Sequence, residues 1–411
     1  PDGIPFIRAG NLQDRISIDG ADTLPIEILN TIGSKASKAG DAVFTSKGSV
    51  GRMSFVNEDD PIVIYSPQLC YWRSLDQEKI HSKWLFYWMH GREFWGQIYG
   101  LKGQTDMADY VSLRDQRQME ITLPSIKSQR KVAKTISSLD DKIALNRRQN
   151  ETLEAMAQAL FKSWFVDFDP VIDNALAAGV ALPEALQARA ARRQAVLESG
   201  TYPRLDAKVQ ALFPDRFEWS EKLGKFVPEG WESSTLGKFV KQIKNSVSAH
   251  DINPETPYIG LQQMPRNSIA LSEWKKGEEV ESNKYRFKKD DILFGKLRPY
   301  FHKVGVAPIE GVCSTDIIVL KATKPEYDGI AIALMSSKDV VDYATSSSTG
   351  TRMPRASWNY LKQYSQVGIP DNLCRIYSDR IKPSISKIHE NIHESTTLSS
   401  LRDLLLRELI G

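Results

Sequence analysis

The most regular pattern of apolar and polar positions in this chain is a heptad repeat that begins at Val132. Apolar or amide side chains recur there in alternating steps of four and three residues over about four and a half heptads. The positions are Val132, Ile136, Leu139, Ile143, Asn146, Asn150, Leu153, Ala157, Leu160 and Trp164. This pattern predicts a coiled-coil seam on one long helix of about 36 residues, on the order of 55 Å in length.

A second apolar seam lies near the end of the chain. It consists of Ile381, Ile385, Ile388 and Ile392, followed by Leu398, Leu401, Leu405 and Leu409. The phase of the pattern slips near Ser395, and Pro383 lies where the helix should run. Because proline lacks the backbone donor of the helix ladder, we expect this helix to start or kink at Pro383.

The apolar seams of the two helices can be buried in two ways. The more economical is an antiparallel, intramolecular coiled coil in which they pair with each other, and the alternative is that each meets a partner protein. Two positions of the first seam are asparagines, Asn146 and Asn150. Buried asparagines would fix the register of the helices at a cost in stability; alternatively, both lie at a solvated edge.

Each long helix follows a stretch that is typical of a globular domain. Short β-rich runs punctuated by Gly, Pro, Asn and Asp, with one helical segment in each stretch, predict mixed α/β domains with mainly local strands. The expected strands include 42–44, 61–65, 290–294 and 316–320, and the expected helices are 82–89 and 328–335. An Ala-rich helix is also expected at 182–197 in the joining segment.

The two halves of the chain are an internal repeat with a period of about 250 residues. Gly40-Asp41-Ala42-Val43-Phe44 recurs as Asp290-Asp291-Ile292-Leu293-Phe294, and Gly103-Gln104-Thr105-Asp106-Met107 recurs as Gly350-Thr351-Arg352-Met353. The matches are collinear, which chance does not easily produce. Because the second half has an opening segment that the first lacks, we expect roughly 20–25 residues to be missing from the start of the first unit.

We therefore predict an α/β protein with two α/β domains separated by two long helices that form an antiparallel coiled coil with a pseudo-twofold internal repeat. The predicted boundaries are 1–122 for the first domain, 123–166 for the first helix, 167–227 for a central joining segment, 228–368 for the second domain and 369–411 for the second helix.

Composition narrows the function only slightly. The chain has 411 residues, 41% of them hydrophobic, and a net charge of +3, which excludes a polybasic protein but leaves a nucleic-acid partner open. Residues 1–125 contain 13 basic and 16 acidic side chains, and residues 230–370 contain 19 and 15. Because phosphates repel a net negative domain, a DNA contact of the first domain must depend on local placement of charge.

Cysteine usage and hydropathy indicate a compartment. Cys70, Cys313 and Cys374 are odd in number and far apart, which argues against a disulfide scaffold and for a reducing environment. No apolar run approaches the ~20 residues of a membrane span, and no signal peptide opens the sequence. We expect a cytoplasmic protein without a membrane partner.

Catalytic motifs are largely missing. The sequence has no GxxxxGK[ST] loop, no Gly-rich turn spaced for S-adenosylmethionine or a dinucleotide, and no Asn-Pro-Pro-aromatic or Pro-Cys motif of DNA methyltransferases. Glu273-Trp274-Lys275 has the ExK form of nuclease metal sites but lacks a suitable partner Asp. His389 and His393 have helical i, i+4 spacing without a third zinc ligand nearby. We therefore expect neither a catalytic site nor a bound metal.

The repeated loops carry the chemistry that remains. They are rich in Arg and Lys, which can bond guanine, in Gln, which can bond adenine, and in Ser, Thr and Lys, which can hold phosphates. The candidate DNA-binding residues are Lys47, Ser49, Arg52, Gln104 and Thr105 in the first domain, and Lys296, Arg298, Tyr300, Lys303, Thr351, Arg352 and Arg355 in the second. On residue type alone, these segments could equally be ordinary solvated loops.

In motif content and order, the whole chain resembles the specificity (S) subunit of type I restriction-modification systems. The motifs are Leu123-Pro124, Ser128-Gln129, Ala159-Leu160-Phe161-Lys162-Ser163-Trp164-Phe165-Val166-Asp167-Phe168, Leu212-Phe213-Pro214, Val227-Pro228-Glu229-Gly230-Trp231 and Gly350-Thr351-Arg352-Met353. The second half departs from the pattern at Cys374-Arg375, where the first half has Ser128-Gln129, which puts in doubt whether the two helices begin alike.

The resemblance implies a non-catalytic subunit with two target recognition domains. Each would bind one half of an asymmetric, bipartite site in double-stranded DNA, with two conserved helices setting the spacer. It also implies two modification (methyltransferase) subunits and restriction (translocase and nuclease) subunits as partners, which would carry S-adenosylmethionine, ATP and Mg, so that this chain binds no cofactor itself. The alternatives are a coiled-coil adaptor without base recognition and a stand-alone DNA-modifying enzyme.

Overall fold

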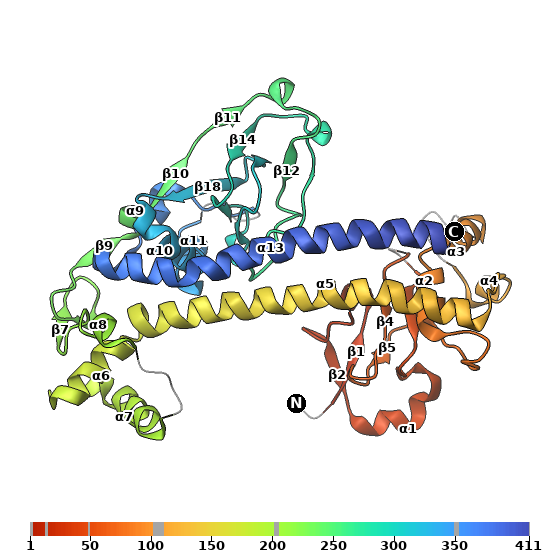
Figure 1. Ribbon diagram of the computed structural model, residues 1–411, viewed down its shortest axis with the longest axis horizontal. Coiled ribbons are helices and arrows are strands. Elements are labelled where there is room, and N and C mark those ends of the chain that lie inside the picture. Colours follow the sequence, from red (N-terminus) through yellow and green to blue (C-terminus); the bar gives the residue numbers. More distant parts are fainter. Residues whose placement is uncertain are drawn as a thin grey trace. The chain divides into compact units, whose positions relative to one another are not determined.

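The computed structural model describes residues 3–12, 15–47, 50–101, 111–200, 205–348 and 353–410. The chain forms two compact units, residues 1–144 with 397–411 and residues 145–396. Two long helices, α5 (Ile126–Phe161) and α13 (Asp371–Leu409), contribute residues to both units (Figure 1). Each unit thus joins a mixed α/β domain to one stretch of each long helix.

The first unit contains two three-stranded sheets, β2-β1-β5 and β4-β3-β6. Its strands are β1 (Ile4–Ile7), β2 (Asp22–Leu24), β3 (Ala42–Thr45), β4 (Met53–Phe55), β5 (Ile64–Tyr65) and β6 (Leu69–Trp72). Its helices besides α5 and α13 are α1 (Leu29–Ile32), α2 (Ser82–Trp88), α3 (Arg92–Leu101) and α4 (Leu113–Gln116).

β3 is the central strand of the first unit and is buried on both faces. Because side chains alternate along a strand, Ala42 and Phe44 face one way and Val43 faces the other. Ala42 and Phe44 pack in a cluster with the tryptophans of α2 and with Ala133 of α5, whereas Val43 packs in a second cluster with Ile7 of β1. This packing joins the two sheets of the unit to each other and to α5.

The second unit has a four-stranded sheet, β10-β18-β15-β16, a five-stranded sheet, β11-β14-β17-β12-β13, and the pairs β7-β8 and β9-β19. Its strands are β7 (Phe217–Ser220), β8 (Lys225–Pro228), β9 (Ser233–Thr235), β10 (Val240–Ile243), β11 (Ser246–Val247), β12 (Pro257–Ile259), β13 (Lys275–Lys276), β14 (Lys284–Phe287), β15 (Ile292–Gly295), β16 (Val304–Val306), β17 (Gly311–Cys313), β18 (Ile317–Ala322) and β19 (Ser365–Val367). Its helices are α6 (Asp169–Ala178), α7 (Glu184–Ser199), α8 (Ala207–Gln210), α9 (Leu236–Phe239), α10 (Asp328–Met335), α11 (Lys338–Ser346) and α12 (Trp358–Leu361).

The same strand pairings recur in the two units. β3 pairs antiparallel with β4 and β6, as β15 does with β16 and β18, and β1 pairs parallel with β5, as β12 does with β17. Backbone hydrogen bonds recur as well. The amide of Ser66 donates to Ile7 and that of Ser314 donates to Ile259, both at 3.0 Å. The match between residues 40–44 and 290–294 therefore corresponds to a repeated strand pairing.

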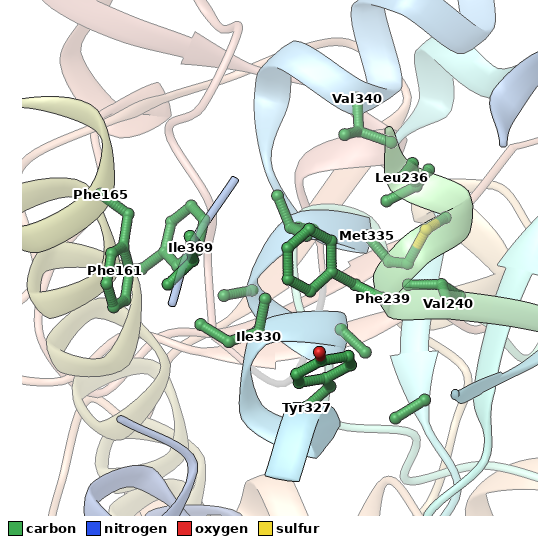
Figure 2. Packing of buried hydrophobic residues seen from close by; sticks show 14 of the residues in the cluster. Phe161, Phe165, Leu236, Phe239, Val240, Tyr327, Ile330, Met335, Val340 and Ile369 are labelled. Atoms are coloured by element: carbon green, nitrogen blue, oxygen red, sulfur yellow. The ribbon is translucent and has the colours of Figure 1, made fainter. Parts of the chain in front are cut away.

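The largest core cluster belongs to the second unit and joins its α/β domain to the ends of the long helices. Figure 2 shows Phe161 of α5 and the following Phe165 packed beside Ile369, next to Ile330 of α10. Phe239, at the end of α9, closes the cluster beside Tyr327, with ring centroids 5.1 Å apart. Burial of this many aromatic and aliphatic side chains holds the second domain firmly against α5 and α13.

α13 runs through Pro383 as one helix, so the expectation that it would start or kink there is wrong. Pro383 lies on the exposed face of the helix, whereas the neighbouring Ile381, Ile385 and Ile388 are buried. Burying each such side chain contributes about 1.5–3 kcal/mol, which together offset the roughly 3 kcal/mol cost of an interior proline.

Polar contacts in the second unit show that its stretches of α5 and α13 run antiparallel. The hydroxyl of Tyr377 donates to the carbonyl of Ala157 at 2.9 Å, and Asn391 Nδ2 donates to Asn150 Oδ1 at 2.9 Å. Asn146 Nδ2 donates to Glu394 at 2.8 Å. Residue numbers therefore rise along one helix as they fall along the other. Because Asn146 and Asn150 are 0% and 6% exposed, they do not lie at a solvated edge.

In the first unit, α5 and α13 are linked by Arg402, which bonds Asp140 at 3.2 Å, and by Ile410, which packs on the cluster that contains Ala133. The remaining predicted positions differ in burial. Ile136, Ile143, Ile381, Ile385, Ile388 and Ile392 are buried, while Val132, Leu139, Leu153, Leu160 and Leu405 are half-buried. Leu401 and Leu409 are 42% and 44% exposed, so the prediction that they lie in the seam is wrong; after Ser395 these leucines are out of phase with the buried isoleucines.

The segment that joins α5 to the α/β domain of the second unit contains the expected Ala-rich helix, α7. Its basic residues are engaged within the segment. Arg189 bonds Asp169 at 2.7 Å, and Arg193 bonds Asp173 at 2.6 Å. No helix in the described part of the chain has the length and apolar character that a membrane crossing requires.

Candidate nucleic-acid interface

Four candidate DNA-binding residues of the second unit lie on one hairpin. The turn between β15 and β16 holds Lys296, Arg298, Tyr300 and Lys303 and includes a short 3-10 helix, Pro299–Phe301. Arg298 adopts a left-handed backbone conformation with φ of 51°, as does the following His302 with φ of 48°. Such conformations are costly for residues with side chains, so the surrounding contacts must hold this turn in place.

The second repeated loop supplies those contacts. Leu297 and Arg355 form an antiparallel bridge, the amide of Arg298 donates to Pro354 at 2.8 Å, and the amide of Ala356 donates to Lys296 at 2.8 Å. The structure therefore brings Lys296, Arg298 and Arg355 together from two segments of the sequence. Thr351 and Arg352, also predicted on this loop, lie outside the described residues.

A carboxylate lies among these cations. Asp316, at the start of β18, places Oδ1 3.2 Å from Arg355 Nε and 4.0 Å from Lys296 Nζ. Its carbonyl also accepts a hydrogen bond from the amide of Lys296 at 2.9 Å. Two of the predicted DNA-binding cations are thus already oriented by an acidic side chain.

Tyr300 and Lys303 lie in different surroundings on the same hairpin. Tyr300 is 51% exposed, with its ring against Phe301, and the guanidinium of Arg266 lies 4.1 Å from the Phe301 ring centroid. Lys303 instead donates inward to the carbonyl of Leu261. Burial lowers the pKa of Lys303, and the nearby positive charge of Arg266 lowers it further. Tyr300 is therefore better placed than Lys303 to meet a ligand.

Arg298 is half-buried, and its Nε is one of the buried polar atoms without a hydrogen-bond partner among the described residues. Leaving such a donor unsatisfied costs free energy, which a bound acceptor would recover. This makes Arg298 a strong candidate for a ligand contact.

The first unit presents a corresponding turn between β3 and β4. Lys47 and Arg52 are both exposed, and the amide of Arg52 donates to Thr45 Oγ1 at 3.1 Å. Gly51 has φ of 108°, and a Cβ there would lie 2.2 Å from the Trp95 ring. Only glycine fits this position without displacing Trp95. Ser49, Gln104 and Thr105 lie outside the described residues.

The two turns share their backbone contacts but differ in side chains. The amide of Val111 donates to Ser46 at 3.0 Å, as the amide of Ala356 does to Lys296. The positions are therefore equivalent, yet one carries a hydroxyl and the other an ammonium group. Arg266 and Asp316 lie outside the repeated loops, so no repeat in the sequence points to them.

His389 and the other possible metal ligands were compared with the geometry that a metal site requires. The described residues contain no group of three or more His, Cys, Asp or Glu that could hold a metal ion. His389 is buried, with Nδ1 3.5 Å from Asp290. Burial lowers its pKa, although Asp290 opposes that shift. Its surroundings thus favour the neutral imidazole of a packed helix residue.

Known proteins similar to this chain share one description. Residues 1–155 match the family described as type I restriction modification DNA specificity domain. The chain is also 27% identical over 336 residues to the type I restriction enzyme HindI specificity subunit of Haemophilus influenzae, covering 71% of this chain and 68% of that protein. In its first 155 residues and over most of its length, the chain is thus similar to the specificity subunits of type I restriction enzymes.

The chain is also similar to the type I restriction enzyme MjaIX specificity subunit of Methanocaldococcus jannaschii, with 21% identity over 72% of this chain and 60% of that protein. The fold is that of a solved type I restriction-modification S subunit from M. genitalium, with a TM-score of 0.51, 15% identity, and coverage of 100% of this chain and 89% of that chain. Residues 1–155, which match this family, include the turn with Lys47 and Arg52. In the second unit, Lys296 lies at the position that Ser46 has in the first, by the matching backbone bonds from Ala356 and Val111.

Proposed function

We propose that this chain is the DNA specificity subunit of a type I restriction-modification system, with one half of a bipartite DNA site bound by each α/β domain. The observation that carries the proposal is that the turns from β3 to β4 and from β15 to β16 start from the same strand pairing in both units. The described backbone bonds at Ser46 and Lys296 match, but the two side chains differ. A fixed scaffold with variable loops suits two domains that recognise different base sequences.

The long helices have a separate role in this proposal. We propose that α5 and α13 form an antiparallel coiled coil that sets the DNA spacer and docks two modification subunits. The polar contacts between the helices and the buried asparagines support this role, because buried polar residues fix the register of such helices.

Catalysis is assigned to the partners. In this proposal the chain is a non-catalytic subunit, and the modification and restriction subunits carry S-adenosylmethionine, ATP and Mg. The absence of methyltransferase and nucleotide-binding motifs from the sequence supports this division of labour.

The test is methylome sequencing of DNA exposed to the assembled complex of this chain with its modification subunits. We expect methylation at one bipartite motif with a fixed spacer. Exchanging residues 228–368 for the corresponding domain of another specificity subunit should change only one half of that motif. Methylation without a motif, or binding that is insensitive to salt and sequence, would instead favour an adaptor without base recognition.

A further inference from the structure

Asp316 lies where two candidate DNA-binding segments of the second unit meet. Its carbonyl bonds the amide of Lys296 at 2.9 Å, and its carboxylate lies 3.2 Å from Arg355 Nε and 4.0 Å from Lys296 Nζ. The segments that carry Lys296 and Arg355 are themselves paired through the Leu297 bridge. One carboxylate therefore contacts both cations of a surface that we propose to face DNA.

Stability alone is a weak reason for this arrangement. The side chains of Asp316 and Arg355 are 29% and 46% exposed, and exposed ion pairs contribute little to folding. A carboxylate also repels the phosphates that Lys296 and Arg355 would attract. An acid in this place weakens DNA binding in general, so its benefit must lie elsewhere.

The geometry of Arg355 indicates what that benefit is. Asp316 engages Nε, while the two terminal nitrogens, Nη1 and Nη2, have no hydrogen-bond partner among the described residues. Those two nitrogens form the end-on fork of the guanidinium, which can donate to O6 and N7 of one guanine. Fixing Nε also removes rotational freedom that the arginine would otherwise lose on binding.

We propose that Asp316 is a positioning residue that orients Arg355 for bidentate hydrogen bonding to a guanine in the half-site of the second domain. This inference rests on the proposed function. It names the base that is recognised, the residue that recognises it and the half-site in which that base lies. Lys296, held by the same carboxylate at a longer distance, is left to contact phosphate.

Comparison with the first unit indicates which half-site a change at Asp316 should affect. Ser46 corresponds to Lys296, because the carbonyl of each accepts a hydrogen bond from a backbone amide of the second loop, that of Val111 or of Ala356. Gln68 corresponds to Asp316, because the amide of Ser46 donates to Gln68 as the amide of Lys296 donates to Asp316. Both of these residues are neutral. Among the described residues of the first domain, no acid occupies the position of Asp316, and changes at Asp316 should leave the half-site of that domain unaffected.

The experiment measures competition binding by the full chain assembled with its modification subunits. The competitors are duplexes in which each base pair of both half-sites is replaced in turn. The variants are Asp316→Ala, Arg355→Ala, the double variant, and Asp316→Asn, which retains an oxygen acceptor for Arg355 Nε. The matched control is Glu255→Gln, because Glu255 forms an exposed ion pair with Lys276 at 3.0 Å in the same domain.

We expect Arg355→Ala to lose about tenfold or more in discrimination at one G·C pair of the second half-site. Asp316→Ala should lose discrimination at that same pair while binding unrelated DNA several-fold more tightly, since it removes a negative charge. The double variant should lose no more discrimination than Arg355→Ala, and Asp316→Asn should retain most of it. Glu255→Gln should discriminate as the unsubstituted chain does.

Three results would overturn the inference: additive losses in the double variant, losses at different base pairs, or an equal change on every sequence. An unsubstituted complex without any sequence preference would refute the proposed function itself. Because the variants are compared base by base, that outcome is distinguishable from a specific failure of Asp316.

Discussion

The buried asparagine pair between the long helices offers a direct test of how they are held in register. Asn391 is 0% exposed and Asn150 is 6% exposed. Asn391 Nδ2 donates to Asn150 Oδ1 at 2.9 Å and to Gln149 Oε1 at 3.3 Å, whereas Asn391 Oδ1 has no partner among the described residues. Asn150 and Asn391 are therefore buried polar side chains whose hydrogen bonding is incomplete.

The perturbation is a double-mutant cycle with Asn150→Leu, Asn391→Leu and both together. Each single change leaves one buried amide facing a leucine, which costs about 1–3 kcal/mol. In the double variant no unpaired amide remains, and an apolar pair in place of a polar one is close to neutral or stabilising. The single losses should therefore not add, with a coupling free energy of roughly 2 kcal/mol or more.

The assay is thermal unfolding of the full chain. The second unit comprises residues 145–396, and for a domain of that size 1 kcal/mol corresponds to about 2–4 °C in Tm. Each single variant should melt ~2–12 °C lower, and the double variant should return close to the unsubstituted chain. Thr152→Ala is the control, because Thr152 is exposed on α5 and bonds only its own helix. A double variant that loses the sum of the two single losses would refute the claim that these amides form one unit.

Three further predictions concern the helices, the hairpin and pH. Inserting seven residues into both α5 and α13 adds ~10 Å, so the spacer of the modified sites should lengthen by about three base pairs at ~3.4 Å each; an unchanged spacer in methylome sequencing would contradict a ruler role. If Arg298 bonds a guanine, Arg298→Ala should weaken binding by about 1–3 kcal/mol on the cognate half-site, whereas equal losses on all sequences in competition binding would identify a phosphate contact. Burial lowers the pKa of His389 below its ordinary value of 6.5, with Lys289 and His393 adding to the shift and Asp290 opposing it. The unfolded chain therefore takes up the proton first, and the stability of the folded chain falls as pH falls below that value. Between about pH 7 and pH 5, the Tm of His389→Gln should fall less than the Tm of the unsubstituted chain.

Local periodicity was sufficient to predict the long helices, but not that α13 continues through a proline or which leucines of its last part are buried. The heptad pattern from Val132 predicts α5 because a helix repeats its face every few residues. At Pro383 the local rule failed, because burial of the neighbouring isoleucines outweighs one missing hydrogen bond. At Leu401 the pattern failed because a phase slip redirects the side chains that follow it.

The candidate interface was predictable only in part. Lys296, Arg298 and Arg355 were found because the loops that carry them are repeated in sequence. That these loops pair with each other, and that Asp316 lies between them, depends on the register of β15 with β18, which no local pattern encodes. Arg266 was missed for the same reason, since its contact with Phe301 is tertiary.

A pair of equivalent acids shows how the repeated scaffold has diverged. Asp41 accepts a bond from the amide of Lys38 at 2.9 Å, and Asp291 accepts the same bond from Lys288 at 2.8 Å. Beyond this shared turn their surroundings differ.

Asp41 is also bound by the hydroxyl of Tyr65 at 2.8 Å and by Arg73, whereas burial raises the pKa of Asp291, with backbone hydrogen bonding and two lysines opposing the shift. The backbone bond that shapes the turn is kept while the side chains around it change. A domain that must present a turn in one place but vary what the turn recognises needs this separation, because the backbone then fixes position and the side chains fix specificity. The contrast between Ser46 with Gln68 and Lys296 with Asp316 follows the same division at the proposed DNA surface. On this argument, exchanging side chains within a turn should alter the recognised half-site without altering the fold.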